Sequence, residues 1–277
     1  MEKITKNHTN VSISTNTTLA LLRKMLEING FLWTACVVPY VLLRKLKPNL
    51  RIHFLNQYLR RLEAKHNLPG MNSEELNVLI WETWNWEMKG GEEWTISPEW
   101  KQSIIDDVML KYLTPGKAVL EIGPGAGKWT STLQQIAQKL VIVDISSKCI
   151  EVCKKGFSDC TNISYFVTRG SNLSFLQNNS IDFIWSYDVF VHIAPADIEI
   201  YIEEFQRVLK PGGRGVIHHA GEGGNHGGWR SKLTNRLFVE FLEKNKLQLV
   251  SQFDSWGDTK QFDLKHYHDS ITVFEKA

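Results

Sequence analysis

A glycine-rich loop flanked by two acids is the part of this sequence whose residue types most clearly indicate ligand chemistry. Residues 119–127 read Val-Leu-Glu-Ile-Gly-Pro-Gly-Ala-Gly, an apolar strand that runs into a loop with three glycines. Glycines permit a sharp turn and let a ligand approach the backbone. Asp144 ends the next predicted strand, 23 residues after Glu121. At that spacing a carboxylate can accept hydrogen bonds from both hydroxyls of a ribose.

Two residues of the loop favour a nucleoside ligand that lacks a phosphate. Pro124 removes one backbone N–H, whereas a pyrophosphate is held by as many N–H groups as a loop can present. Glu121 adds negative charge where a dinucleotide would place its phosphates, so an ammonium or sulfonium group suits the loop better. The alternative, a structural turn beside a stray acid, is disfavoured by the pattern further along the chain.

The downstream pattern consists of a strand at 181–187, Asp188 and a Leu-Lys-Pro-Gly-Gly segment at 209–213. With the glycine loop and Asp144, it resembles the class I S-adenosylmethionine-dependent methyltransferases over about residues 98–277. The resemblance implies S-adenosyl-L-methionine as cofactor, with its methionine part on the glycine loop and its ribose on the acid after the second strand. Many relatives carry an acid before the glycine that follows the third strand. Here Arg169 stands there, so Ser171 or Asn172 is expected to contact adenine. The expected cofactor-binding residues are Glu121, Gly123, Pro124, Gly125, Gly127, Asp144, Ile145, Gly170, Ser171, Asn172 and Tyr187.

Three histidines stand where the resemblance places the methyl acceptor. His192 follows the fourth predicted strand, and His218 and His219 end the fifth. Because adjacent strand residues point to opposite faces, at most one of His218 and His219 faces the cleft. A hydroxyl acceptor needs a base, a role that suits histidine at neutral pH. The predicted catalytic residues are His219 or His192, with Asp188 assisting. For each histidine the alternative is a hydrogen-bonded structural side chain.

Two further segments bear on the acceptor. Half of the ten tryptophans fall within twenty residues, beside Glu92 and Glu93. Aromatic faces next to carboxylates commonly hold sugar rings; the alternative is a helical cap that packs its tryptophans on the core. The glycine-rich stretch 221–230 suits a mobile lid, with simple disorder as the alternative. Residues 91–95, 188–192, 218–219 and 253–257 together are similar to bacterial methyltransferases that act on sugar hydroxyls, including enzymes of saccharide and natural-product pathways. The tryptophans are Trp81, Trp84, Trp86, Trp94 and Trp100.

Composition excludes several functional classes. The formal net charge of the 277-residue chain is only +2, which gives no electrostatic footprint for nucleic acid. The four cysteines lack a CxxC spacing, so reduced thiols in a cytoplasmic protein are expected. Asp188 could bind a divalent metal, as in some sugar methyltransferases, but no metal-ligand spacing accompanies it, and no metal is predicted.

Hydrophobic periodicity predicts the elements that position these residues. Apolar strands alternate with helical stretches from residue 117 to residue 218, and a helix at 229–246 and strands at 247–253 and 270–275 follow. This order predicts an α/β, Rossmann-like sheet that is mostly parallel and has an antiparallel C-terminal strand. The expected organisation is a disordered tail at 1–18, an N-terminal helical extension at 19–97 and the methyltransferase domain at 98–277.

The N-terminal extension combines an apolar run at 31–43 with a basic stretch at 44–61. The run is too short to span a bilayer, which needs about 20 apolar residues. Two interpretations stand: residues 31–61 lie on an anionic membrane surface, or they pack on the domain and expose a solvated basic face. A homodimer is also compatible with the sequence.

The sequence therefore predicts a cytoplasmic S-adenosylmethionine-dependent methyltransferase that methylates a hydroxyl of a saccharide or natural-product metabolite. One alternative is an N-methyltransferase acting on a small amine, which would need no histidine base. Another is a non-catalytic partner protein that binds the cofactor. Nucleic-acid methylation is disfavoured because residues 186–189 read Ser-Tyr-Asp-Val rather than an Asn/Asp-Pro-Pro-Tyr segment.

Overall fold

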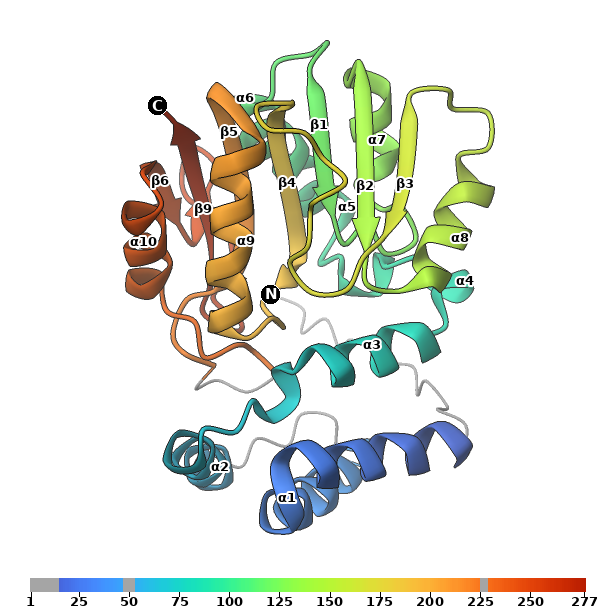
Figure 1. Cartoon of the computed structure of the whole chain (residues 1–277), viewed down its shortest axis with the longest axis vertical. Coiled ribbons are helices and arrows are strands. Elements are labelled where there is room, and N and C mark those ends of the chain that lie inside the picture. Colours follow the sequence, from blue (N-terminus) through green and yellow to red (C-terminus); the bar gives the residue numbers. More distant parts are fainter. Residues whose placement is uncertain (1–14, 47–52, 225–228) are drawn as a thin grey trace.

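The apolar runs form a seven-stranded sheet in a computed structural model that describes residues 15–46, 53–224 and 229–277 (Figure 1). The strand order is β3-β2-β1-β4-β5-β9-β6, and only β9 runs antiparallel to its neighbours. The expected mostly parallel sheet with an antiparallel C-terminal strand is therefore confirmed. The strands are β1 (Ala118–Ile122), β2 (Lys139–Asp144), β3 (Ile163–Val167), β4 (Ile181–Phe190), β5 (Leu209–Ala220), β6 (Leu247–Phe253) and β9 (Asp269–Lys276).

Helices cover both faces of the sheet because alternate strand residues are apolar on both sides. Val119 and Leu140 face a core that is closed by α7 (Thr130–Ile136), α8 (Ser147–Gly156) and the helical stretch 98–112. Leu120 and Val141 face a second core, closed by α9 (Pro195–Val208) and α10 (Asn235–Lys244). The stretch 98–112 comprises α5 (Pro98–Ser103), η3 (Ile104–Met109) and α6 (Leu110–Tyr112), and a small hairpin of β7 (Ser255–Trp256) and β8 (Phe262–Asp263) packs beside it.

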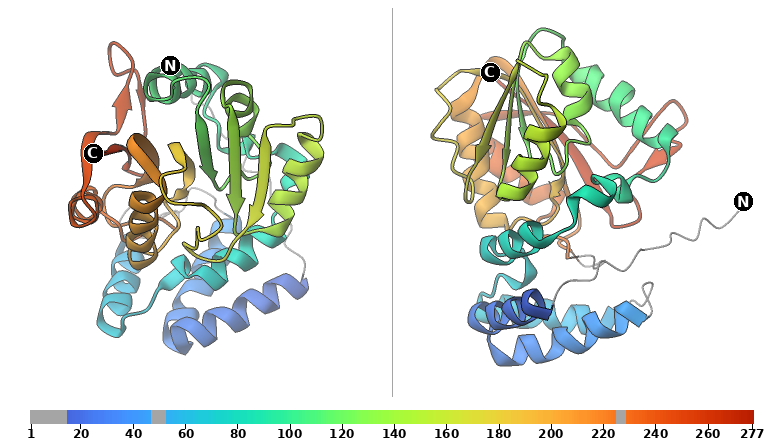
Figure 2. Two further views of the ribbon diagram at one scale, coloured as in Figure 1. Left: turned by 45° about the horizontal axis from the view of Figure 1, so that its top comes forward. Right: turned by 90° about the vertical axis from the view of Figure 1, so that its right-hand side faces the viewer.

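The N-terminal helices lie beneath the carboxyl ends of the parallel strands, where Figures 1 and 2 show α3 between α1 and the sheet. Helix α1 bends at Gly30, whose φ of 76° is non-helical, and Pro39 lies within the helix. A small core of its own, which includes Trp33, Leu62 and Leu76, joins α1, α2 and α3. The elements are α1 (Thr15–Leu46), α2 (His53–His66), η1 (Gly70–Asn72), α3 (Glu74–Thr83), α4 (Trp86–Lys89) and η2 (Glu92–Trp94).

Some element boundaries differ from the sequence-based expectation. Helix α10 begins at Asn235 rather than Trp229, because the Thr234 side chain caps it and Trp229 has a positive φ. Helix α1 already begins at Thr15, within the tail expected to be disordered. Residues 1–14, 47–52 and 225–228, which include parts of the predicted tail, basic stretch and lid, lie outside the described residues.

Candidate functional site

The glycine loop packs closely against a tryptophan of the N-terminal extension. Gly125 has a φ of 58°, and a Cβ placed there would lie 2.8 Å from the ring of Trp86. A Cβ on Gly123 would lie 2.2 Å from the side chain of Val189, near the end of β4. The loop therefore needs glycine both for its backbone conformation and for the close approach of its neighbours.

Glu121, at the carboxyl end of β1, is a buried acid with spare hydrogen-bonding capacity. Its Oε2 accepts a hydrogen bond from the Thr130 hydroxyl at 2.6 Å, whereas its Oε1 is buried and has no partner among the described residues. Burial raises the pKa of its carboxyl to about 8. A cationic group placed beside Oε1 would satisfy this oxygen and favour the ionised form.

Asp144 ends β2 beside the glycine loop, as the sequence predicted. Burial raises the pKa of its carboxyl to about 6, and its Oδ1 accepts a hydrogen bond from the Ser146 N–H at 2.9 Å. Half-buried Ile145 lies between the two residues. The Ser146 hydroxyl donates to the Trp81 carbonyl at 3.4 Å, so the N-terminal extension closes over this strand end as well.

The turn after β3 holds the three residues expected beside adenine. The Gly170 carbonyl accepts a hydrogen bond from the Tyr201 hydroxyl at 3.0 Å, and Ser171 is buried. Asn172 accepts a hydrogen bond from the Ser174 N–H through its side-chain oxygen. A Cβ on Gly170 would lie 2.8 Å from Glu74 of α3, so α3 also borders this turn.

His218 at the end of β5 is held between two carboxylates. Its Nδ1 lies 3.2 Å from Oδ1 of Asp188, and its Nε2 lies 3.5 Å from Oδ2 of Asp269. Arg230 pairs with Asp269 at 2.8 Å, and Tyr187 stacks on the imidazole. Nδ1 also accepts a hydrogen bond from the Asp188 backbone N–H at 3.1 Å. Burial opposes a charge on His218, but the neighbouring carboxylates of Asp188 and Asp269 outweigh it and raise the pKa of the imidazole above its ordinary value.

Asp188 reaches His218 through a local distortion of β4. Its φ of 62° lies in the left-handed region, which is uncommon for a residue other than glycine, and the pairing of β4 with β5 shifts register between Ser186 and Phe190. Burial of the carboxylate is outweighed by its hydrogen bond to His218, which keeps the pKa of Asp188 well below its usual range. Sites of chemistry commonly hold such strained residues.

His192 lies in the same cluster, but its pKa is shifted in the opposite direction from that of His218. Its Nδ1 lies 3.3 Å from the Trp229 carbonyl. Because a carbonyl can only accept, Nδ1 carries the proton and Nε2 keeps its lone pair. Burial, and then the Arg230 guanidinium, lower the pKa of this imidazole to about 4. His192 is therefore neutral near pH 7 and can accept a proton.

The N-terminal extension positions His192 from two sides. The side-chain amides of Asn72 and Asn77 donate to the His192 carbonyl at 3.1 and 3.0 Å. Asn72 also donates to the Trp229 carbonyl at 2.9 Å. The ring of Trp81 packs on the imidazole. Neither asparagine was predicted from the sequence, since nothing local distinguishes a ligand-site asparagine from a helix-capping one.

His219 points into the opposite face of the sheet. Its Nδ1 lies 2.9 Å from the Ala220 carbonyl and its Nε2 lies 2.6 Å from the Thr272 hydroxyl, and its ring stacks on Phe238 of α10. The expectation that only one of the two adjacent histidines faces the site is met, but that residue is His218. With both ring nitrogens engaged in the core, His219 is not retained as the base.

A cluster of buried polar groups that sequence analysis did not find lies next to Asp188. The Lys128 ammonium, the Tyr187 hydroxyl and the Trp100 indole N–H are buried and have no hydrogen-bond partner among the described residues. Burial lowers the pKa of Lys128, against the carboxylates of Asp188 and Glu92. Buried polar groups are normally satisfied, so this cluster offers hydrogen-bonding groups to a polar ligand. The sequence feature that could have revealed these groups is Lys128, because it directly follows the last glycine of the loop.

The tryptophan cluster, defined here as Trp81, Trp84, Trp86 and Trp94, forms the cover of the glycine loop. The four rings contact one another with centroids 5.5–6.2 Å apart. The Trp86 indole N–H donates to the Trp81 carbonyl at 2.9 Å. This arrangement matches the packed helical cap that was one of the two sequence-based interpretations; a sugar-binding role stays a prediction.

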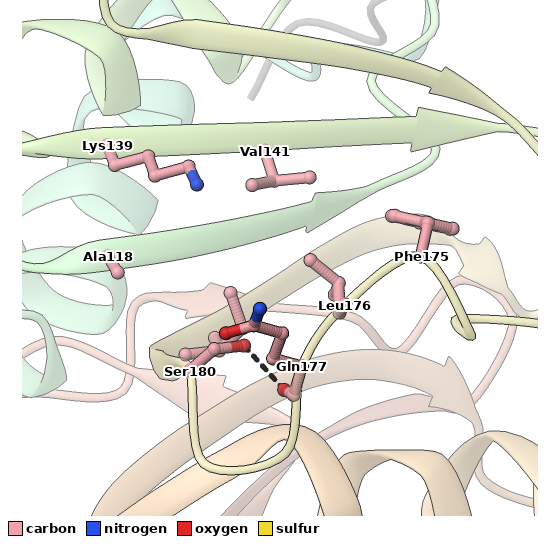
Figure 3. A pocket seen from close by; sticks show the side chains of 8 residues that line it. Ala118, Lys139, Val141, Phe175, Leu176, Gln177 and Ser180 are labelled. Atoms are coloured by element: carbon pink, nitrogen blue, oxygen red, sulfur yellow. Dashed lines mark hydrogen bonds between the residues drawn. The ribbon is translucent and has the colours of Figure 1, made fainter.

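A cavity of about 250 Å³ lies at the opposite end of the strands, near the amino ends of β1 and β2 (Figure 3). Ala118, Lys139 and Ser180 line it, and none of the candidate site residues does. Because ligands of open parallel sheets bind at the carboxyl ends of the strands, this cavity has no part in the candidate site. Within the described residues there is also no cluster of three or more His, Cys, Asp or Glu side chains that could hold a metal ion.

Comparisons with known proteins match the part of the chain that contains the glycine loop. Residues 119–213 match a family model described as a methyltransferase domain. A Mycobacterium marinum protein whose name assigns it provisionally to the O-methyltransferases is 36% identical over 126 residues, 43% of this chain and 54% of that protein. A demethylmenaquinone methyltransferase from Tropheryma whipplei is 31% identical over 105 residues, 38% of this chain and 42% of that protein. The chain thus spans about half the length of the curated relatives it matches.

Solved structures share the fold at low sequence identity. Phosphoethanolamine N-methyltransferase 1 of Haemonchus contortus superposes with a TM-score of 0.56 at 15% identity, covering 73% of this chain and 49% of that one. The N-methyltransferase NodS of Bradyrhizobium japonicum, in complex with S-adenosyl-L-homocysteine, superposes with a TM-score of 0.54 at 18% identity, covering 67% and 92%. The sheet order and these likenesses define the Rossmann-like fold of class I S-adenosylmethionine-dependent methyltransferases.

Proposed function

We propose that this protein is an S-adenosylmethionine-dependent methyltransferase that methylates a hydroxyl group of a small-molecule acceptor. The observation that carries the proposal is the neutral His192 beside the ionised Asp188, at the strand ends next to the glycine loop. The cofactor supplies an electrophilic methyl group when it is bound. The chain's own residues must bind it, align the acceptor and remove a proton.

The cofactor side rests on groups that match the ligand's chemistry. The free Oε1 of Glu121 suits an ammonium group, and Asp144 suits the two ribose hydroxyls. Gly123, Gly125 and Gly127 all have a positive φ, which lets the loop turn sharply at the end of β1. The methyltransferase-domain match over residues 119–213 supports this assignment.

The acceptor side rests on a division of labour between two histidines. Nε2 of His192 accepts the proton of the acceptor hydroxyl, because this imidazole is neutral at physiological pH. His218 lies between Asp188 and Asp269 and accepts a hydrogen bond from the Asp188 backbone N–H, so it acts as a positioning residue for Asp188. The half-buried Asp188 then orients the acceptor.

We propose a saccharide or natural-product metabolite as the acceptor class. A ring with several hydroxyls would match the unpaired Lys128 ammonium, Tyr187 hydroxyl and Trp100 indole N–H, and would stack on the surrounding aromatic rings. The O-methyltransferase names of the mycobacterial relatives support a hydroxyl as the methylated group. An N-methyltransferase remains the second candidate, favoured by the names of two structural neighbours.

The test is transfer of a labelled methyl group from S-adenosylmethionine into separate saccharide, polyketide and small-amine pools. Label in the saccharide or polyketide pool that is lost in the His192→Asn variant supports the proposal. Label confined to amines and independent of His192 would move the assignment to N-methylation. Measured cofactor binding without transfer to any pool would favour a non-catalytic partner protein.

A further inference from the structure

The N-terminal helices expose several large apolar side chains to solvent. On α1, the exposed residues are Leu19 and Leu26 before the bend at Gly30 and Phe31, Leu32 and Leu43 after it, whereas Leu21, Met25, Trp33 and Val37 are buried. Phe31 is 79% exposed, and Phe54 at the start of α2 is 76% exposed. Large apolar side chains gathered in this way mark an interaction surface.

Helix α2 exposes aromatic and basic side chains. Phe54, Tyr58, Arg61 and Lys65 lie three and four residues apart and are all exposed, so they share one side of the helix. The buried side of α2 carries Leu59, Leu62 and Glu63. Glu63 accepts a hydrogen bond from the Trp33 indole and pairs with Arg60. The outward side is therefore separate from the contacts that hold the helix to the protein.

Charge identifies the partner that fits this face. Residues 19–68 contain nine Lys and Arg against two Glu, whereas the rest of the chain contains 23 Lys and Arg against 28 Asp and Glu. A second copy docked through the same face would bring basic groups against basic groups. An anionic lipid surface complements both the charge and the exposed aromatic and aliphatic side chains.

We propose that the outward face of α1 and α2, defined by Leu19, Leu26, Phe31, Leu32, Phe54, Tyr58, Arg61 and Lys65, docks on an anionic lipid bilayer. None of the helices in the described residues is long and apolar enough to cross a membrane. The contact is therefore peripheral, with the apolar side chains in the headgroup region and the basic ones against lipid phosphates. This inference is independent of the proposed methyl transfer.

Flotation of the full chain with lipid vesicles tests the proposal. Vesicles of phosphatidylcholine mixed with phosphatidylglycerol should carry the protein upward, whereas vesicles of phosphatidylcholine alone should carry much less. The double variant Phe31→Ser, Phe54→Ser should lose about tenfold or more of the binding. The double variant Arg61→Glu, Lys65→Glu should lose it to a similar degree, and salt should weaken the wild-type protein in parallel.

The matched control replaces exposed apolar residues elsewhere. Leu249 and Val250 of β6 are each 45% exposed, and the double variant Leu249→Ser, Val250→Ser should float like the wild type. Thermal melting checks that every variant is folded. Absent flotation of the wild type, or equal flotation of all variants, would overturn the proposal. So would a wild-type dimer in light scattering that Phe31→Ser, Phe54→Ser converts to monomer, because a second copy would then be the occupant.

Discussion

The ring of Trp81, from the N-terminal extension, packs on the ring of His192 after β4, with centroids 5.6 Å apart. These residues are more than a hundred positions apart in the chain, and Asn72 and Asn77 reinforce the contact by donating to the His192 carbonyl. The extension therefore forms one wall of the candidate site. Asn72, Asn77 and Trp81 precede residues 98–277, which carry the family resemblance, yet they help to position the proposed base.

Replacing His192 with asparagine should lower turnover about 10²- to 10⁴-fold while leaving cofactor affinity nearly unchanged, because the variant cannot accept the acceptor proton. Steady-state kinetics and a calorimetric titration measure the two effects. The exposed His266, replaced in the same way, serves as the control and should retain full turnover. Unchanged turnover in the His192 variant would remove it from the base role.

Asn72→Ala should lower turnover in addition to stability, because Asn72 holds the carbonyls of both His192 and Trp229. Asn162 is a matched control: its side-chain amide also donates to two backbone carbonyls, those of Gln134 and Ala137, outside the site. Each variant should lose about 1–3 kcal/mol of unfolding free energy, measured by chemical denaturation. Equal turnover in the two variants would argue against a positioning role for Asn72.

Affinity for S-adenosylmethionine should rise as the pH increases toward 8. The Glu121 carboxyl, whose pKa burial raises to about 8, is mostly protonated near pH 7. An ammonium group on the ligand favours the carboxylate form of Glu121, so binding below pH 8 must release a proton. The affinity should therefore fall by at most about tenfold for each pH unit below 8. Calorimetry in buffers of different ionisation enthalpy counts the released proton. A Glu121→Gln variant should bind more weakly at pH 8 and lose this pH dependence; retention of the same slope would contradict the assignment.

The same carboxyl should make the ligand-free protein less stable as pH rises. Its folded pKa of about 8 lies above the ordinary value of 4.5, so between these values the folded state binds the extra proton and loses stability with increasing pH. The cost at pH 8 is on the order of a few kcal/mol. Thermal melting of wild type and Glu121→Gln across this window should therefore show a gap in melting temperature that widens toward pH 8. A gap that stays constant would speak against a raised pKa.

Gly125→Ala should abolish cofactor binding and destabilise the protein more than Gly116→Ala does. Both glycines have a positive φ, so both variants carry the backbone strain of a Cβ in the left-handed region, about 1–2 kcal/mol. Only at Gly125 would the Cβ collide with a ring, 2.8 Å from Trp86, while nothing lies within 4 Å at Gly116. Denaturation and cofactor titration compare the two. Equal losses in both would show that crowding at Gly125 has no effect.

Local sequence determined which residues meet in the proposed cofactor half of the candidate site. The glycine spacing, Glu121 and Asp144 lie on or directly after neighbouring parallel strands, so their proximity follows from the strand pattern alone. The alternation of side chains along a strand likewise required that His218 and His219 face opposite sides. Hydrophobic periodicity was sufficient to place the parallel strands along the chain, because β1, β2, β4 and β5 contain buried apolar runs.

Only the tertiary structure decided which histidine faces the site and what surrounds it. The choice of His218 depends on the bulge at Asp188 and on Asp269, which lies opposite Ala220 through the antiparallel pairing of β9 with β5. The lowered pKa of His192 depends on burial and on Arg230, which belongs to a loop nearly forty residues further along the chain. These are long-range contacts that no local pattern encodes, because electrostatics and burial depend on which segments meet in space.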